Sequence, residues 1–202
     1  MNKGAKVVIV VFVFLFIFFL PTIISTFDSE PTDKFLSEIK IMEDGSIIVR
    51  ELIKMNGEYN GMDRDLAYAS YGNEEYNGNI SAIEGDSTLY DGSSITDVRV
   101  GSISDDGDLT FDDFDRDVNY FDEVSYASNG TASKYTYSTF MDEVNLKIYN
   151  PSSLDEIFYI EYTVTDVVVV HEDIAELAWN TLGEGYRENI GDYEVKVILP
   201  NS

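Results

Sequence analysis

Ser37 and Lys40 have the spacing of the serine and lysine that act together in penicillin-binding enzymes. That chemistry needs a helical turn, because residues three apart are neighbours on a helix. Here Ile39 and Ile41 alternate with polar residues, a pattern that predicts a strand. Residues three apart on a strand point to opposite faces, so we interpret the match as accidental.

His171 is the single histidine of the chain and follows a run of valines. A catalytic histidine needs a nucleophile within reach, and the sequence contains neither a Gly-x-Ser-x-Gly elbow nor a phosphate-binding loop. We therefore interpret His171 as an edge-strand or capping residue. Trp179 is interpreted as core material rather than as a ligand-stacking residue.

The segment from Ser102 to Asp113, SISDDGDLTFDD, partly follows the twelve-residue pattern of a calcium loop. Residues that fit positions five, six, seven, nine and twelve are Asp106, Gly107, Asp108, Thr110 and Asp113. Positions one and three carry Ser102 and Ser104, so two carboxylates are replaced by neutral hydroxyls. Any calcium affinity should then be weak, with a dissociation constant of ~10⁻⁴ to 10⁻³ M. The alternative is a solvated acidic loop.

No catalytic, cofactor-binding or metal residue is assigned, and no cofactor is expected. With 38 acidic side chains, any carboxylate pair could be proposed for glycoside hydrolysis, so no pair is diagnostic.

The elements that would position such residues are clearest near the C-terminal end. Phe158 to Val164 alternates strictly, with Phe158, Ile160, Tyr162 and Val164 expected on the buried face and Tyr159, Glu161 and Thr163 on a wet face. Three- and four-residue apolar spacing predicts one short helix within 171–183. A last strand is expected from Tyr193 to Leu199, with Tyr193, Val195, Val197 and Leu199 pointing inward.

The earlier part of the domain reads as short strands separated by turns. Asp44-Gly45 predicts a hairpin between strands containing Ile39 and Ile47. Further strands are expected at 80–83, 98–103, 118–124, 135–139 and 144–149, with turn signals between them. This pattern predicts a mostly β fold, an antiparallel β-sandwich with one short helix near its C-terminal end. Arg64 is interpreted as a structural ion pair that closes a loop.

Residues 1–26 form a candidate membrane helix. Lys3 and Lys6 precede an uninterrupted apolar run from Val7 to Leu20, which continues beyond Pro21. The length suits either a signal peptide or an uncleaved signal anchor, and we favour the anchor because bulky residues precede each candidate cleavage point. Residues 27–34 read as a tether, and residues 35–202 as the domain, with the lysines inside and the acidic domain outside.

The charge of the 202-residue chain excludes some partners. Its formal net charge of -25 makes nucleic acid an unfavourable partner, since a polyanion gains nothing from counterion release there. The acidic surface is compatible with solubility alone or with a cationic polymer or envelope protein as partner. The absence of cysteine excludes disulfides and thiolate chemistry.

Two separated patches of the sequence are distinctive. The first is YIEYTVTDVV followed by AELAWN, a glycine turn and a strand ending in ILP; the second is DGSIIVRELIKMNGEYNGMDRDL, from Asp44 to Leu66. Together they resemble the domain-of-unknown-function 2207 family of predicted bacterial membrane proteins. Where family members carry a second tryptophan after the glycine turn, this chain has Tyr186, and its middle third matches nothing. The resemblance implies an outward-facing β-rich domain, truncated here before further transmembrane segments of a multi-pass protein, and it implies no activity.

The sequence therefore predicts a membrane-anchored extracytoplasmic domain, most simply a structural or interaction module at the cell envelope and not an enzyme. Two alternatives stay open: a surface domain that responds to divalent cations, and a cell-envelope hydrolase.

Overall fold

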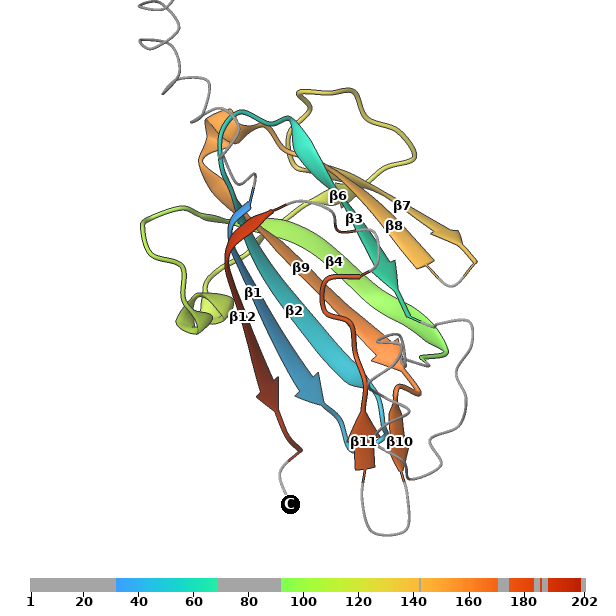
Figure 1. The fold of residues 1–202 in the computed structure, drawn as a ribbon. Coiled ribbons are helices and arrows are strands. Elements are labelled where there is room, and N and C mark those ends of the chain that lie inside the picture. The colour runs from blue at the N-terminus through green and yellow to red at the C-terminus, as the bar shows by residue number, and fades with distance from the viewer. Residues whose placement is uncertain are drawn as a thin grey trace, which may run out of the picture.

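Two β-sheets packed face to face build the domain (Figure 1). The computed structural model describes residues 32–68, 92–141, 143–170, 175–183, 186 and 189–200. The candidate membrane helix at residues 1–26, the expected strand at 80–83 and His171 lie outside these residues.

The larger sheet has six strands. In spatial order they are β12 (Ile190–Ile198), β1 (Thr32–Ile41), β2 (Ile47–Met55), β9 (Glu156–Thr165), β4 (Ser94–Ser104) and β5 (Asn119–Tyr120). Asp44-Gly45 forms the predicted β1–β2 turn: Gly45 has φ 84° and the Met42 amide donates to the carbonyl of Ser46 at 2.9 Å. β1 begins at Thr32, so the last residues assigned to the tether are strand residues.

The smaller sheet has four strands, in the order β3 (Gly61–Ala67), β8 (Glu143–Tyr149), β7 (Lys134–Phe140) and β6 (Asp122–Glu123). The strands expected at 98–103, 135–139 and 144–149 are thus confirmed as parts of β4, β7 and β8. The 118–124 prediction corresponds to two short strands, β5 and β6.

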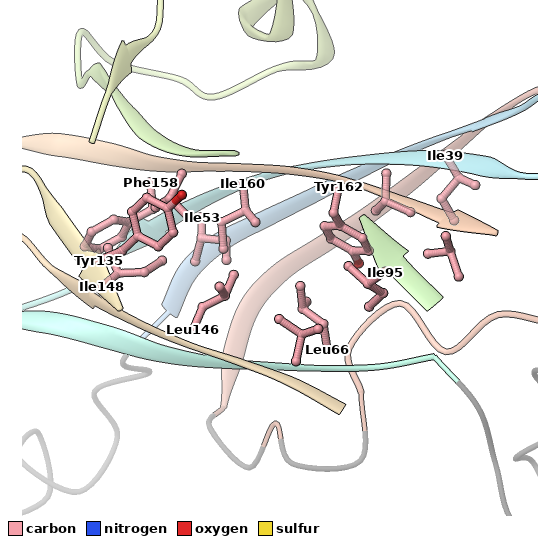
Figure 2. Close-up of a cluster of buried hydrophobic side chains, with 14 of the residues drawn as sticks. Ile39, Ile53, Leu66, Ile95, Tyr135, Leu146, Ile148, Phe158, Ile160 and Tyr162 are labelled. Carbon is pink, nitrogen blue, oxygen red and sulfur yellow. The ribbon is translucent and has the colours of Figure 1, made fainter. Parts of the chain in front are cut away.

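The main core lies between the two sheets. Figure 2 shows Ile53, Phe158, Ile160 and Tyr162 of the larger sheet facing Leu66, Tyr135, Leu146 and Ile148 of the smaller one. Phe158, Ile160, Tyr162 and Val164 are all buried, which confirms the predicted inward face of β9.

A second, smaller core covers the opposite face of the six-stranded sheet. The segment after β4 folds over that face and includes a 3₁₀ turn, η2 (Phe111–Asp115), that buries Phe114. Tyr159, expected on a wet face, is consequently only 3% exposed. The prediction of one wet face was wrong at this position because an irregular segment, which has no periodic signal, supplies the cover. A second short 3₁₀ turn, η3 (Ser152–Leu154), precedes β9.

The short helix expected within 171–183 is wrong. Ala175–Leu177 is strand β11, which pairs with β10 (Val168–Val170) in an antiparallel hairpin. Val168 also donates its amide to the carbonyl of Gly45 at 3.1 Å, which attaches the hairpin to the β1–β2 turn. β-branched valines favour this pairing, and it outweighs the weak helical spacing of the residues that follow.

The sheets are mixed rather than purely antiparallel, which corrects the second part of the fold prediction. β12 runs parallel to β1, and β6 runs parallel to β7. After β9, the chain passes through the β10–β11 hairpin and returns to the end of the sheet where β1 begins, so β12 must run in the direction of β1 (Figure 1).

The inward orientation predicted for the last strand is also wrong for most of its residues. Tyr193 packs on the main core, but Val195, Val197 and Leu199 are 42%, 52% and 70% exposed. β12 lies at the margin of the larger sheet, where no described residue of the smaller sheet pairs with it or buries these side chains.

Candidate functional site

Arg64 is the centre of the most developed polar cluster between the two sheets. It projects inward from β3, where it is 2% exposed, and faces Glu51 on β2, which is fully buried. The Arg64 guanidinium donates from Nε to Glu51 Oε2 at 2.9 Å and from Nη2 to Oε1 at 2.7 Å. Tyr162 on β9 donates its hydroxyl to the same carboxylate at 3.0 Å. A fork-like pair of this kind fixes both the distance and the angle between the sheets.

The remaining Arg64 donors hold the chain segment that leads into β12. Nη1 donates to the carbonyls of Asp65 and Leu182 at 2.9 and 2.6 Å, and Nη2 donates to the carbonyl of Thr181 at 2.8 Å. Together with the two bonds to Glu51, these contacts use all five N–H groups of the guanidinium. Arg64 therefore has no donor left for a substrate or ligand.

Aromatic rings close the cluster. The Arg64 guanidinium lies 5.6 Å from the ring centre of Phe35 and 5.8 Å from that of Tyr186. Tyr186 shares a hydrogen bond of 2.6 Å with the hydroxyl of Thr32, and Tyr193 shares one with Thr181. The aromatic faces stabilise the buried cation, and the two hydrogen bonds attach Tyr186 to β1 and Thr181 to β12.

The protonation states follow from this environment. Burial alone would lower the pKa of Arg64, but the charge of Glu51 and the hydrogen bonds to it outweigh burial and raise the pKa above its ordinary value. Burial, followed by the charge of Glu51, raises the pKa of Tyr162 well above that of a free tyrosine. Burial raises the pKa of Tyr193 to about 12. Tyr162 and Tyr193 thus stay neutral and Arg64 stays charged at physiological pH.

Gly183 allows residues 181–183 to approach β3. Its φ is +75°, and a Cβ at this position would lie 2.9 Å from the carbonyl oxygen of Asp65. A side chain would therefore push this segment away from the strand that Arg64 holds it against.

A hollow of about 400 Å³ lies beside this cluster, along the outer rim of β3. Its walls include Asp63, Asp65, Lys147, Tyr149 and Tyr186. Asp65 accepts a hydrogen bond from Asn145 at 3.0 Å, and Lys147 lies 5.9 Å from the ring centre of Tyr149. No serine, threonine, cysteine or histidine is among its lining residues in the described part of the chain, so it offers no nucleophile paired with a base.

A second carboxylate, Glu38 on β1, organises the opposite face of the large sheet. It is 4% exposed, accepts from Arg50 Nε at 3.0 Å and Arg50 Nη2, and accepts from Lys196 Nζ at 2.9 Å. Arg50 also donates to the carbonyl of Phe114 at 3.1 Å and lies over its ring. Burial raises the pKa of Glu38, but its bonds to Arg50 and Lys196 outweigh that effect and the pKa is lowered.

The family of the chain follows from comparison with known proteins. The family model for the predicted membrane protein (DUF2207) N-terminal domain matches residues 32–202. The chain belongs to this family. No curated protein and no solved structure matches it.

The match confirms the family inferred from the two sequence patches, and it extends across the middle third that resembles nothing by inspection. The family's description assigns no molecular function to the DUF2207 domain. Within the described residues, no helix is long and apolar enough to cross a membrane.

The calcium-like segment of this DUF2207 domain has most of its carboxylates already occupied. Asp105 pairs with Lys54 at 2.8 Å, Asp106 pairs with Arg116 at 2.7 Å, and Asp113 accepts from the Thr110 amide at 2.7 Å. Ser102, at the first ligand position, is buried in β4 and donates to Glu156 at 2.8 Å. Among the described residues, no group of three or more acidic, histidine or cysteine side chains could hold a metal ion.

Other residues singled out from the sequence lie where strand geometry places them. Ser37 is buried on β1 while Lys40 is exposed, so the serine–lysine pair is separated by the sheet. Trp179 is half-buried and packs on the main core, although on an irregular segment rather than on a helix.

The prediction that Arg64 forms a structural ion pair is confirmed, but the expectation that the pair closes a loop is wrong, because Arg64 lies on β3 and pairs across the two sheets with Glu51, which sequence reasoning missed. Glu51 occupies the inward series of β2 that also contains Ile47, Val49 and Ile53. A charged residue in an apolar series was the available signal, because a buried charge requires a partner from the facing layer.

Proposed function

We propose that this chain is an outward-facing, membrane-anchored domain with a structural or interaction role at the cell envelope, and that it is not an enzyme. The family description as a predicted membrane protein supports the membrane association. Lys3 and Lys6 ahead of the apolar run support an orientation with the acidic domain outside.

The observation that carries this proposal is the complete use of Arg64. Catalytic sites keep charged groups available for a substrate or a transition state. Here the most buried cation donates every N–H group to Glu51 and to backbone carbonyls. A domain whose buried charges serve its own architecture fits a scaffold or docking role.

The surface charge suggests the chemistry of the partner. A net charge of -25 favours a basic envelope protein or a cationic polymer and disfavours nucleic acid. Neither the cation-responsive alternative nor the hydrolase alternative gains support from the described residues, since the acidic loop is engaged in ion pairs and the hollow beside β3 lacks a nucleophile.

The orientation can be tested with single cysteines, because the natural chain has none. Tyr126→Cys places a thiol at a residue that is 77% exposed on the domain, and Asn2→Cys places one ahead of the membrane segment. A membrane-impermeant maleimide added to intact cells should label the first variant, and should label the second only after lysis. Labelling of Asn2→Cys alone in intact cells would refute the proposed orientation.

The interaction role can be tested by chemical cross-linking in native envelopes, followed by purification of the full chain. A basic protein or polymer should co-purify, and its yield should fall when the salt concentration is raised before cross-linking. Recovery of the chain without any partner or second copy would contradict an interaction role.

A further inference from the structure

β12 is the terminal strand of the larger sheet. It pairs with β1 without any register shift, and no described residue pairs with its other side (Figure 1). Exposed edges are templates for another strand, and proteins commonly protect them with charged side chains, bulges, proline or a covering segment. β12 has no proline between Ile190 and Ile198, and its apolar Val195 and Val197 are 42% and 52% exposed. The protection that β12 does have is charge, from side chains such as Glu194 and Lys196, so an added strand must match those charges.

The charged face of β12 carries a cross-strand row that stops at the edge. Arg50, Glu38 and Lys196 are aligned in register on β2, β1 and β12, so their charges alternate as positive, negative and positive. Both cations bond the Glu38 carboxylate. The row ends on the cation at the margin, and a carboxylate on an added strand would continue the alternation.

The apolar face has a similar row. Val49, Ile39 and Val197 are aligned across the same three strands, and the first two are buried. Val197 ends this row and is half exposed. An added strand must therefore bring an apolar side chain to one face and a carboxylate to the other.

β12 itself meets both requirements. When two copies of β12 run antiparallel with Val195 opposite Val195, Glu194 lies opposite Lys196 of the second copy and Tyr193 lies opposite Val197. Opposite charges in directly facing positions stabilise an antiparallel pair. The Glu194 carboxylate, held by Lys34 at 2.6 Å, is already on the charged face of the strand.

The same charges reject the neighbouring registers. A shift by two residues in one direction brings Lys196 opposite Lys196, and in the other direction brings Glu194 opposite Glu194; like charges directly opposite are destabilising. A shift by one residue joins the apolar face of one copy to the charged face of the other. One register is therefore favoured over the alternatives.

We propose that β12 pairs antiparallel with β12 of a second copy of this chain, centred on Val195, so that two large sheets join into one. This rests on the interaction role proposed above and adds a second copy of the chain as a partner, besides the basic partner that the surface charge favours. Pairing through a single strand is a small interface, so we expect weak association that depends on concentration.

The net charge of -25 on each copy opposes this contact at long range. At physiological ionic strength the screening length is about 8 Å, so distant repulsion is reduced more than the interaction of directly facing residues. Added salt should therefore strengthen the self-association, whereas it should weaken the capture of a basic partner.

Cysteine cross-linking of the full chain in non-ionic detergent tests the register. Directly opposite residues of an antiparallel pair have Cα atoms about 4.5–5.5 Å apart, within the range that a disulfide spans. Under mild oxidation, Val195→Cys should form a disulfide-linked dimer. Val197→Cys is the matched control, because it is equally accessible but its counterpart lies four residues along the strand, about 13 Å away. We expect Val197→Cys to cross-link at least roughly ten-fold less.

A charge variant gives a second measurement. Adding Glu194→Lys to Val195→Cys places a lysine opposite Lys196 of the second copy, and should slow cross-linking several-fold without disturbing the core, since the Glu194 side chain is 47% exposed. Equal cross-linking of Val195→Cys and Val197→Cys, or none in either variant, would overturn the proposal. Cross-linking of Val195→Cys to a different envelope protein would overturn self-pairing while supporting the interaction role.

Discussion

The two buried carboxylates of the large sheet, Glu51 and Glu38, differ in how their cations meet solvent. Glu51 faces the smaller sheet, and its partner Arg64 is 2% exposed. Glu38 faces the irregular cover, and the side chains of its partners Arg50 and Lys196 are 25% and 46% exposed. Both carboxylates have two or more charge-assisted hydrogen bonds, so the number of contacts does not separate them.

The two carboxylates differ in their surroundings once one of their cations is removed. Loss of Arg64 would strand a charge with no access to water, whereas loss of Lys196 would leave Glu38 with Arg50 and nearby solvent. The centre of the sandwich therefore depends on the single ion pair between Glu51 and Arg64. The margin near β12 can exchange its charged contacts at little cost, as a docking edge requires.

Replacement of Arg64 should have the largest effect. Arg64→Met leaves Glu51 buried without a cation and should lower the free energy of unfolding by about 3–5 kcal/mol. Denaturant unfolding of the full chain in detergent measures this. The double variant Glu51→Leu with Arg64→Met should recover part of the loss, because no charge remains stranded. If Arg64→Met alone lowers the free energy of unfolding by less than about 1 kcal/mol, the buried Glu51 pair contributes no more to stability than a solvent-exposed ion pair does.

The chain segment that Arg64 holds just before β12 can be strained by a substitution at Gly183, which alters no charge. Gly183→Ala should lower the free energy of unfolding by about 2 kcal/mol, since the left-handed backbone disfavours a side chain and the new Cβ meets the Asp65 carbonyl. Gly57→Ala is the matched control: Gly57 has φ +77° with no atom within 4 Å of the added Cβ. It should cost about half as much in the same unfolding experiment. Equal costs would show that the close approach at Gly183 has no energetic weight.

The Glu38 cluster should respond to acid. Because the pKa of Glu38 is lowered in the folded chain, its stabilising contribution is present above its ordinary value of 4.5 and is lost as the pH falls through the folded value. Glu38→Gln should therefore flatten the decrease in unfolding free energy below pH 4.5. An unchanged acid profile in this variant would exclude Glu38 as a source of acid sensitivity.

Within this cluster the two cations should differ. Lys196→Ala should cost below about 1 kcal/mol, since an exposed lysine contributes little, whereas Arg50→Ala should cost more because it also loses the contacts to Phe114. Comparison of the two denaturation midpoints measures this difference. If Lys196→Ala lowers the free energy of unfolding more than Arg50→Ala does, the contact at β12 is the more important of the two for stability. That result would contradict the idea that β12 can exchange its charged contacts at little cost.

The smallest effect is expected from calcium. Low millimolar calcium should leave the melting temperature essentially unchanged, because Asp105, Asp106 and Asp113 already form ion pairs with Lys54 or Arg116. A rise that is abolished by Asp106→Asn with Asp108→Asn would show that the acidic loop exchanges its cations for a metal, as a native-state ligand must stabilise by mass action.

Much of the local structure could be predicted from the sequence. Alternation gave β9 and its inward face, Asp44-Gly45 gave the first hairpin, and Arg64 was recognised as a structural ion pair. These succeed because side-chain periodicity and turn geometry are properties of a few adjacent residues. The family was inferred separately, from the resemblance of two short stretches of the sequence to that family, and the family model confirms it.

The sequence by itself determined that the chain is mostly β, strongly acidic and without cysteine, and which residues of its strands are apolar. Only the tertiary structure decided what covers them. In the folded domain an irregular segment buries Tyr159, and Ala175–Leu177 forms a strand because it pairs with β10. Val195 and Val197 stay exposed because β12 lies at the edge of the larger sheet. The tertiary structure also decided that Glu51 is the partner of Arg64, because that pairing joins residues 13 positions apart across two facing sheets. The physical reason is that burial and charge pairing depend on neighbours brought together by folding, and no periodicity along the chain encodes them.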